Sequence, residues 1–304
     1  MDIGVDVGVD VGVDIVDAHH HVWRVEDMPW LSGPMVPRIF GPYEPIKRDY
    51  LVDEYIADAT SGGITQSVYV QANWPLDQVV AEVRWLNELH QETGWPTAVV
   101  GSADLFSPDA VEVMKKQAEL PIVRGTRLQL HWHERAEFRY ASAPDRMKDP
   151  VFRRNVAALE DLGWLFELQV FPGQMADAAD LVEAVPDVTF VLVHAGMLTD
   201  RAEETVREWR EGMARLASYP NIVVKLTGQG TFTRRLDPDL IAFVAAETLG
   251  WFGAERAMFG TNFPVEKLWT DLPSLVAAWR SAVPEPDHAA VFAGTARRVY
   301  ALPK

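Results

Sequence analysis

The sequence contains no cysteine among its 304 residues. That absence excludes disulfide bonds, zinc sites built from thiolates, and thiol nucleophiles. It fits a reducing compartment, and we expect a cytoplasmic protein. No apolar run approaches the roughly 18 residues of a membrane-spanning helix, and the first residues lack the basic start and apolar segment of an export signal. The sequence therefore gives no indication of membrane insertion or export.

Basic residues are also scarce. The chain has 44 acidic against 28 basic residues and a formal net charge of −16. Nucleic acid and anionic membranes repel so negative a protein, so we expect neither as a partner. A small-molecule substrate is the expected partner, and an anionic one would have to be bound by local arginines. The sequence leaves room for a homo-oligomer.

What the chain does have is a regular alternation of β-type runs and amphipathic helical patterns, with 48% hydrophobic residues to fill a core. The predicted strands are residues 14–19, 64–72, 97–104, 122–130, 164–170, 188–194, 221–227 and 256–262. The predicted helices lie near residues 50–61, 75–92, 108–119, 150–162, 173–184, 200–217, 238–249, 271–281 and 286–300. Several strands are apolar on both faces, which is typical of a parallel sheet covered by helices. Eight strand–helix repeats over roughly 250 residues predict an α/β fold of the (β/α)8 (TIM) barrel type.

The domain organisation is simple. No linker rich in proline, or in glycine and serine, divides the chain, so we expect one barrel domain over residues 15–304. Residues 4–14 repeat Gly, Val and Asp. Because Gly and Asp weaken strand preference, we expect residues 1–14 to form a low-complexity, loosely held N-terminal extension.

Prolines and glycines mark the predicted helix ends. Capping side chains precede a proline at Ser107-Pro108, Asp149-Pro150 and Asp237-Pro238, which favours a helix start at each place. The glycines that follow helical patterns, and so predict helix ends, are Gly63, Gly94, Gly163 and Gly250.

The stretch Asp17-Ala18-His19-His20-His21-Val22-Trp23 is the most informative one. An alternating apolar run leads into it, so we read it as the end of the first strand. Because strand side chains alternate, His19 and His21 share one face. Two imidazoles so placed can converge on one metal ion or one substrate oxygen.

Polar residues recur at the ends of the other predicted strands. They are Gln71 and Asn73, Asp104, Arg127 with Gln129 and His131, Glu167 with Gln169, His194, Lys225 with Thr227, and Asn262. Charged and imidazole groups are costly to bury unpaired, so their recurrence at one end of the barrel predicts a shared site.

Individual roles follow from residue type. His194 matches the first histidine pair in position, and the planar fork of Arg127 suits a carboxylate or a carbonyl. We expect substrate contacts from Arg127, Gln71, Trp30 and Gln169, with Trp30 supplied by a long first loop over residues 24–49. Lys225 and Glu167 either belong to the site or neutralise each other inside the barrel. For His131 and His133 we favour a loop position beyond the fourth strand.

Five segments together resemble the amidohydrolase superfamily, and most closely its amidohydrolase 2 branch of sugar and dicarboxylate lactonases. They are residues 17–23, Val-Arg-Gly-Thr-Arg at 123–127, Val-His-Ala-Gly at 193–196, Val-Lys-Leu-Thr-Gly at 224–228 and Met-Phe-Gly-Thr-Asn-Phe-Pro-Val at 258–265. The resemblance covers residues 15–302. It implies a (β/α)8 barrel that hydrolyses a small lactone, cyclic ester or amide, with water attacking a carbonyl held by the matching histidines His19, His21 and His194.

The chain departs from that family at the eighth strand. The family motif reads Gly-Ser-Asp-Trp-Pro, and its aspartate is expected to deprotonate the attacking water, whereas this chain has Asn262. A carboxamide is not a general base near neutral pH, so Asn262 is expected to orient water or the carbonyl, and a histidine or Glu167 to act as base.

The cofactor and the reaction are left open at this stage. His19, His21, His194 and Glu167 satisfy the ligand count of a catalytic zinc site, so a divalent metal, with Zn²⁺ favoured, is one reading and a metal-free mechanism is the other. The alternatives to a hydrolase are a decarboxylase or hydratase on the same barrel, and a binding protein with an altered site.

Overall fold

In the computed structural model, which describes residues 14–303, eight parallel strands pair in chain order to form one barrel. The strands are β1 (Ile15–His20), β2 (Ile64–Val70), β3 (Ala98–Gly101), β4 (Val123–Arg127), β5 (Leu165–Leu168), β6 (Phe190–Leu192), β7 (Ile222–Leu226) and β8 (Ala257–Phe259). The predicted (β/α)8 barrel is therefore confirmed. The predicted N-terminal extension lies, apart from Asp14, outside the described residues.

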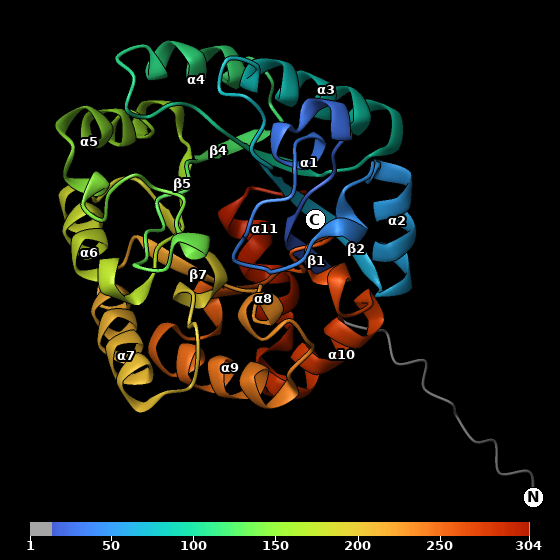
Figure 1. Ribbon diagram of the computed structural model, residues 1–304, viewed down its shortest axis with the longest axis vertical. Helices are drawn as coiled ribbons and strands as arrows, with labels where there is room; N and C mark the ends of the chain where they lie inside the picture. Colours follow the sequence, from blue (N-terminus) through green and yellow to red (C-terminus); the bar gives the residue numbers. More distant parts are fainter. Residues whose placement is uncertain (1–13, 304) are drawn as a thin grey trace, which may run out of the picture.

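Helices α2 to α7, α9 and α10 surround the strands in a ring that follows the chain, and α8 lies inside that ring in this view (Figure 1). The helices are α1 (Pro29–Ser32), α2 (Val52–Ser61), α3 (Val79–Thr93), α4 (Ala110–Ala118), α5 (Pro150–Ala157), α6 (Met175–Ala184), α7 (Glu203–Ala217), α8 (Gly230–Thr233), α9 (Pro238–Phe252), α10 (Leu272–Ala282) and α11 (Thr295–Val299). Across residues 14–303, none of them combines the length and apolar character that a membrane crossing would require.

Most strands are shorter than predicted, because the chain turns away at the rim of the barrel. Gln129, Gln169 and Asn262 were all predicted within strands or at their ends, and they lie in the loops that follow. His194 begins a turn after β6 in which His194, Ala195, Gly196 and Met197 have φ values of 55°, 47°, 71° and 57°. Such left-handed backbone is incompatible with a strand. These polar residues thus lie on rim loops, whereas His19, Arg127 and Glu167 lie in the strands of the wall.

The predicted helix ends are partly confirmed. The Asp149 side chain accepts from the backbone of Val151, and that of Asp237 from Leu240, so both cap helices as predicted. Ser107 does not, because α4 begins only at Ala110. Gly250 was also predicted wrongly: α9 continues through it, and Gly253 ends the helix with a φ of 69°.

The barrel closes where β1 meets the segment after β8. Backbone bonds join His21 N to Phe263 O at 2.8 Å and Asn262 N to His19 O at 2.7 Å. The buried carboxylate of Asp17 accepts from the backbone N–H of Thr261 at 2.8 Å and from its hydroxyl at 2.6 Å. This closure fixes the histidine stretch beside Asn262.

Candidate active site

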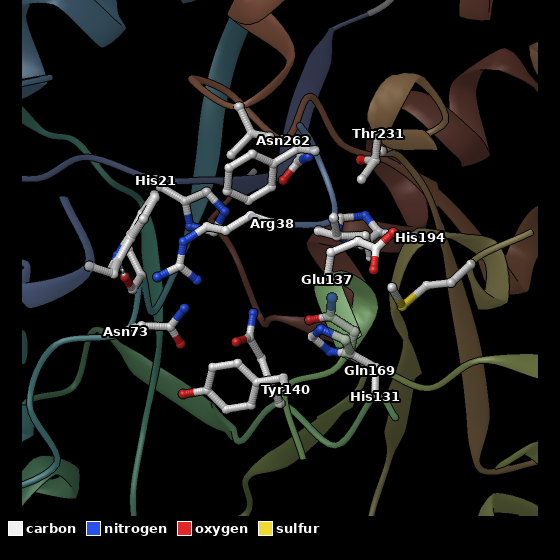
Figure 2. A pocket seen from close by; sticks show the side chains of 18 of the residues that line it. His21, Arg38, Asn73, His131, Glu137, Tyr140, Gln169, His194, Thr231 and Asn262 are labelled. Carbon is white, nitrogen blue, oxygen red and sulfur yellow. Dashed lines mark hydrogen bonds between the residues drawn. The ribbon is translucent and has the colours of Figure 1, made fainter. Parts of the chain in front are cut away.

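A cavity of about 130 Å³ opens at the carboxyl ends of the strands. Figure 2 shows His21, Asn262 and His194 along one side of it, with Tyr140, Gln169 and His131 facing them. The predicted site residues that line the cavity are His21, His194, Asn262, Arg127, Trp30 and Gln169. His19, Gln71 and Glu167 do not line it; they lie one layer behind, against the residues that do.

Three imidazoles cluster at the base of the site. The ring centroid of His19 lies 5.1 Å from that of His21 and 4.9 Å from that of His194. Burial, together with the positive charges of Arg127 and Lys225, lowers the pKa of each of the three histidines below its ordinary value. At neutral pH all three rings are therefore uncharged.

The tautomer of His21 follows from its backbone contact. Its Nδ1 lies 2.7 Å from the carbonyl oxygen of Val70, which only accepts, so Nδ1 carries the proton. Nε2 therefore keeps its lone pair, and His21 and Asn262 both line the cavity. Because the pKa of His21 is lowered to about 3, this ring is a neutral acceptor facing the cavity.

The left-handed turn after β6 positions His194. The indole N–H of Trp209 donates to the carbonyl of Ala195 at 2.7 Å and holds the turn in place. A Cβ at Gly228 would overlap Nδ1 of His194, so only glycine allows the ring to lie where it does. The turn thus presents an imidazole whose buried Nδ1 has no hydrogen-bond partner among the described residues.

Arg127 brings a positive charge to the cavity wall. Its side chain is 2% exposed, and it donates to the backbone carbonyl of Gln71 and to the side chain of Gln169 at 3.5 Å. Its Nε has no partner among the described residues. The side chain of Gln71 accepts from the backbone of Asn73 and does not reach the cavity. Arg127 therefore brings a buried guanidinium to the cavity wall, and one of its donors is unpaired within the described part of the chain.

A charged layer lies below the imidazoles, and we call Glu167, Lys225 and Tyr300 the floor cluster. The Nζ of Lys225 lies 2.5 Å from Oε1 of Glu167, and the hydroxyl of Tyr300 donates to the same oxygen at 2.7 Å. Glu167 and Lys225 are fully buried, so the reading in which they neutralise each other is the one the structure supports. Nζ of Lys225 also lies 3.4 Å from Nδ1 of His19; an ammonium only donates, so the proton of His19 is on Nε2.

The predicted metal ligands do not fit a metal ion as they are arranged. Glu167 is held by Lys225 and Tyr300, and Nδ1 of His19 is used by Lys225. The buried positive charges of Arg127 and Lys225, which disfavour a protonated histidine, would also disfavour a divalent metal ion. Within residues 14–303, no three His, Asp or Glu side chains come together as a metal-binding group.

Several cavity residues escaped the sequence analysis. His131 was assigned to a loop, which is correct, but it is buried and lines the cavity, and burial together with the charge of Arg127 lowers its pKa to about 3. Its position two residues after Gln129 and four after Arg127, on the same alternation, was the available signal. Arg38 comes from the long first loop, and its guanidinium lies 4.9 Å from the ring centroid of Trp30. Glu137, Tyr140 and Thr231 line the cavity without any signal in the sequence.

Known proteins resemble this chain over nearly its whole length. The amidohydrolase family model (Amidohydro_2) matches residues 16–302. An L-fucono-1,5-lactonase of Burkholderia multivorans is 30% identical over 305 residues, covering 95% of this chain and 96% of that protein. A crystal structure of a B. multivorans amidohydrolase with bound HEPES superposes with a TM-score of 0.79 at 30% identity, covering 95% of this chain and 100% of that one. Another, with bound zinc, has a TM-score of 0.78 at the same identity and coverage.

Proposed function

This chain belongs to the amidohydrolase family and is a hydrolase, and from that premise we propose that it opens the lactone ring of a small polyhydroxylated or anionic acid. The observation that carries the proposal is the cluster of three neutral imidazoles beside Arg127 at the base of one cavity. The lactonase name of a relative that matches nearly the whole chain supports the choice of a cyclic ester.

We assign the activation of the attacking water to His21, which accepts its proton, and to Asn262, which contacts the reacting groups. Nε2 of His21 takes a proton as the water oxygen bonds to the lactone carbonyl carbon. The ring C–O bond then breaks, the proton passes to the departing alkoxide oxygen, and the product is the open hydroxy acid. The low pKa of His21 leaves the ring unprotonated, and the oxyanion forming beside it favours the imidazolium of the intermediate. Glu167 is not assigned the role of base, because it is paired with Lys225 below the cavity.

We assign the binding of the lactone carbonyl oxygen to Arg127 and His194. The guanidinium of Arg127 at the cavity wall stabilises the charge that develops on this oxygen in the transition state. Gln169 and Trp30 line the cavity around the rest of the substrate, and Arg38 adds a second guanidinium on the same wall. Two arginines suit hydroxyl or carboxylate groups on the ring.

A metal ion is suggested only by relatives of this chain. A B. multivorans amidohydrolase structure contains zinc, but the donors of this chain do not fit a metal as arranged, so no step is routed through one. Elemental analysis of protein purified without chelator tests this choice. Zinc held stoichiometrically by the wild type, and lost in His19→Ala and His21→Ala, would require the mechanism to be rebuilt around a metal.

A substrate screen tests the proposed reaction. Aldonolactones including L-fucono-1,5-lactone, dicarboxylate lactones and cyclic amides are incubated with wild type and with Asn262→Ala. We expect turnover of a lactone, and a loss of about 100- to 1,000-fold in Asn262→Ala, because a preorganised polar contact to the reacting groups is removed. Thr65→Ala, near the start of β2 and so at the other end of the barrel, serves as the control. Hydrolysis of none of these classes, or an unchanged rate in Asn262→Ala, would contradict the proposal.

A further inference from the structure

The charged groups that line the cavity are mostly positive. They are the guanidinium groups of Arg38, Arg127 and Arg139, whereas Glu137 is the one carboxylate among the described residues of the lining. Glu137 is itself paired, because its Oε1 lies 2.6 Å from a guanidinium nitrogen of Arg135. The cavity histidines are uncharged at neutral pH. The cavity therefore presents unbalanced positive charge in a chain whose formal net charge is −16.

The three arginines differ in what they contact. Arg139 donates to the backbone carbonyls of His133 and Glu134 at 3.0 and 2.9 Å, and its guanidinium lies 4.9 Å from a ring centroid of Trp132. The side chain of Arg38 takes part in none of the hydrogen bonds and ion pairs found between residues 14 and 303, and its Nε is buried without a partner there. Arg38 is thus a cation at the cavity with no carboxylate paired to it in the described structure.

An aromatic platform supports the Arg38 side chain. Trp30, Phe40 and Tyr43 pack together, with ring centroids 6.1, 5.8 and 5.6 Å apart. The guanidinium carbon of Arg38 lies 4.9 Å from the centroid of Trp30 and 5.7 Å from that of Tyr43. The indole N–H of Trp30 donates to the carbonyl of Ala72 at 2.9 Å, which ties the platform to the end of β2. A guanidinium stacked on ring faces keeps its N–H donors at its edges, where a carboxylate binds.

The backbone at Arg38 is fixed as well. Its carbonyl accepts from the N–H of Gly41 at 2.9 Å, which closes a turn in which Gly41 has a φ of 74°. A Cβ at Gly41 would overlap the side chain of Arg234, so the first loop lies against the residue that follows α8. Figure 2 shows the Arg38 side chain pointing into the cavity, toward His21 and Asn73. A guanidinium held in place before a ligand arrives loses little conformational entropy on binding it.

Arg38 and Arg127 act on the same part of the cavity. Burial raises the pKa of Tyr140, and the charges of both arginines oppose that rise, so both lie within electrostatic reach of its hydroxyl. The proposed reaction assigns Arg127 to the reacting carbonyl, which leaves Arg38 for a second group of the substrate. A carboxylate matches both the charge of Arg38 and the two parallel donors at its edge, whereas a hydroxyl would leave the charge uncompensated.

We propose that Arg38 is a specificity-determining residue that binds a carboxylate of the substrate, so that the preferred substrate is a lactone with a free acid group rather than a neutral sugar lactone. The identity of the substrate rests on the proposed hydrolysis, whereas the carboxylate subsite can be tested with molecules that are not hydrolysed. Opening such a lactone gives a dicarboxylate, whose new acid group lies at Arg127 and whose original one lies at Arg38.

The first test measures binding without hydrolysis. Glucarate and gluconate, galactarate and galactonate, and glutarate and 5-hydroxypentanoate are pairs in which a carboxylate replaces a hydroxymethyl group. By calorimetry at neutral pH we expect the dicarboxylate of at least one pair to bind wild type about 10- to 100-fold more tightly, because a charge-assisted pair of hydrogen bonds is added. In Arg38→Met, which keeps a long side chain without the charge, this preference should disappear. Equal binding within every pair in wild type would overturn the proposal.

The second test uses the reaction itself. The lactones of glucarate and galactarate, which keep a free carboxylate, are compared with neutral gluconolactone and galactonolactone. Arg38→Met should raise KM for the carboxylated lactones about 10- to 100-fold with kcat nearly unchanged, because the contact is the same in the ground state and the transition state. KM for the neutral lactones should stay close to that of wild type. Arg38→Lys keeps the charge but not the planar fork, so its KM for the carboxylated lactones should lie between the two.

A matched control removes the same charge elsewhere. Arg207→Met on α7, where the side chain is 66% exposed, should change neither the binding preference nor KM. Thermal denaturation of each variant checks that it is folded. Phosphogluconate serves as an anion of another shape, and tighter binding of it than of every dicarboxylate would assign Arg38 to a phosphate and overturn the proposal.

The outcomes separate this proposal from the proposed function. A preference for dicarboxylates that depends on Arg38, without hydrolysis of any lactone, would uphold the subsite and contradict the proposed function. Hydrolysis of lactones in which Arg38→Met affects neutral and carboxylated substrates equally, or neither of them, would overturn the subsite and leave the hydrolase standing.

Discussion

The cavity and the floor cluster use buried polar groups in opposite ways, although they are adjacent layers of one barrel. In the floor cluster, Oε1 of Glu167 has two donors, Lys225 and Tyr300, and the charges cancel, although Oε2 has no partner among the described residues. In the cavity, Nδ1 of His194, Nε of Arg127 and Nδ1 of His131 are buried without partners among the described residues. Buried groups without partners cost free energy, whereas an ion pair whose charges cancel contributes to the stability of the fold. Substitutions in the two layers should therefore separate activity from stability.

The largest expected effect is on activity in the cavity. His21→Gln removes the proton acceptor but keeps a polar side chain of similar reach, so kcat on the identified lactone should fall by about 100- to 10,000-fold. The melting temperature should stay close to that of wild type, because no charge pair is broken. Steady-state kinetics and thermal denaturation on one preparation measure both quantities. A marked loss of stability with little change in kcat would place His21 with the floor cluster instead.

The next effect is on stability in the floor cluster. Lys225→Met leaves the carboxylate of Glu167 buried without its cation, and we expect a loss of about 3–5 kcal/mol in the free energy of unfolding. Adding Glu167→Leu removes the orphaned charge and should recover most of that loss. Chemical denaturation of the two variants and the wild type measures it. If the double variant were no more stable than Lys225→Met, mutual neutralisation would not be what this ion pair contributes.

The smallest effect comes from the edge of the floor cluster. Tyr300→Phe deletes one hydrogen bond to a charged group and should cost about 1.5–3 kcal/mol while leaving kcat unchanged, since the hydroxyl is separated from the cavity by Glu167 and Lys225. Tyr219→Phe, which removes an exposed hydroxyl contact to Glu183, is the control and should cost less. A fall in kcat without loss of stability would mean that the two layers are coupled.

The sequence predicted the architecture and several of the residues that line the cavity, because both follow local patterns. Alternation placed His19 and His21 on one strand face, and strand ends predicted the positions of His194, Arg127 and Asn262. It could not predict that His21 lines the cavity while His19 lies behind it, since that depends on how the wall curves at the rim. The contact of Glu167 with Lys225, 58 positions apart, was one of two readings until the barrel brought them together.

Glu266 shows the limit most clearly. In sequence it is an ordinary glutamate followed by a lysine, as on many solvated surfaces. Its burial depends on α8 and Trp269 lying over it, and neither contact has a signature in the residues around it. The burial of His131 was not predicted for a related reason: a loop residue is expected at the surface unless the loop folds back over the barrel.

Closure of the barrel joins parts of the chain that are very far apart, since Asp17 and Thr261 are separated by 244 positions. Contacts of such long range form slowly, because the intervening chain must first be ordered or its loop entropy overcome. Individual strand–helix units can become compact earlier, but the wall that carries both His21 and Asn262 exists only after β1 has met the segment following β8. During refolding from denaturant, helical signal should therefore return before hydrolytic activity, and the catalytic wall is assembled in the final step.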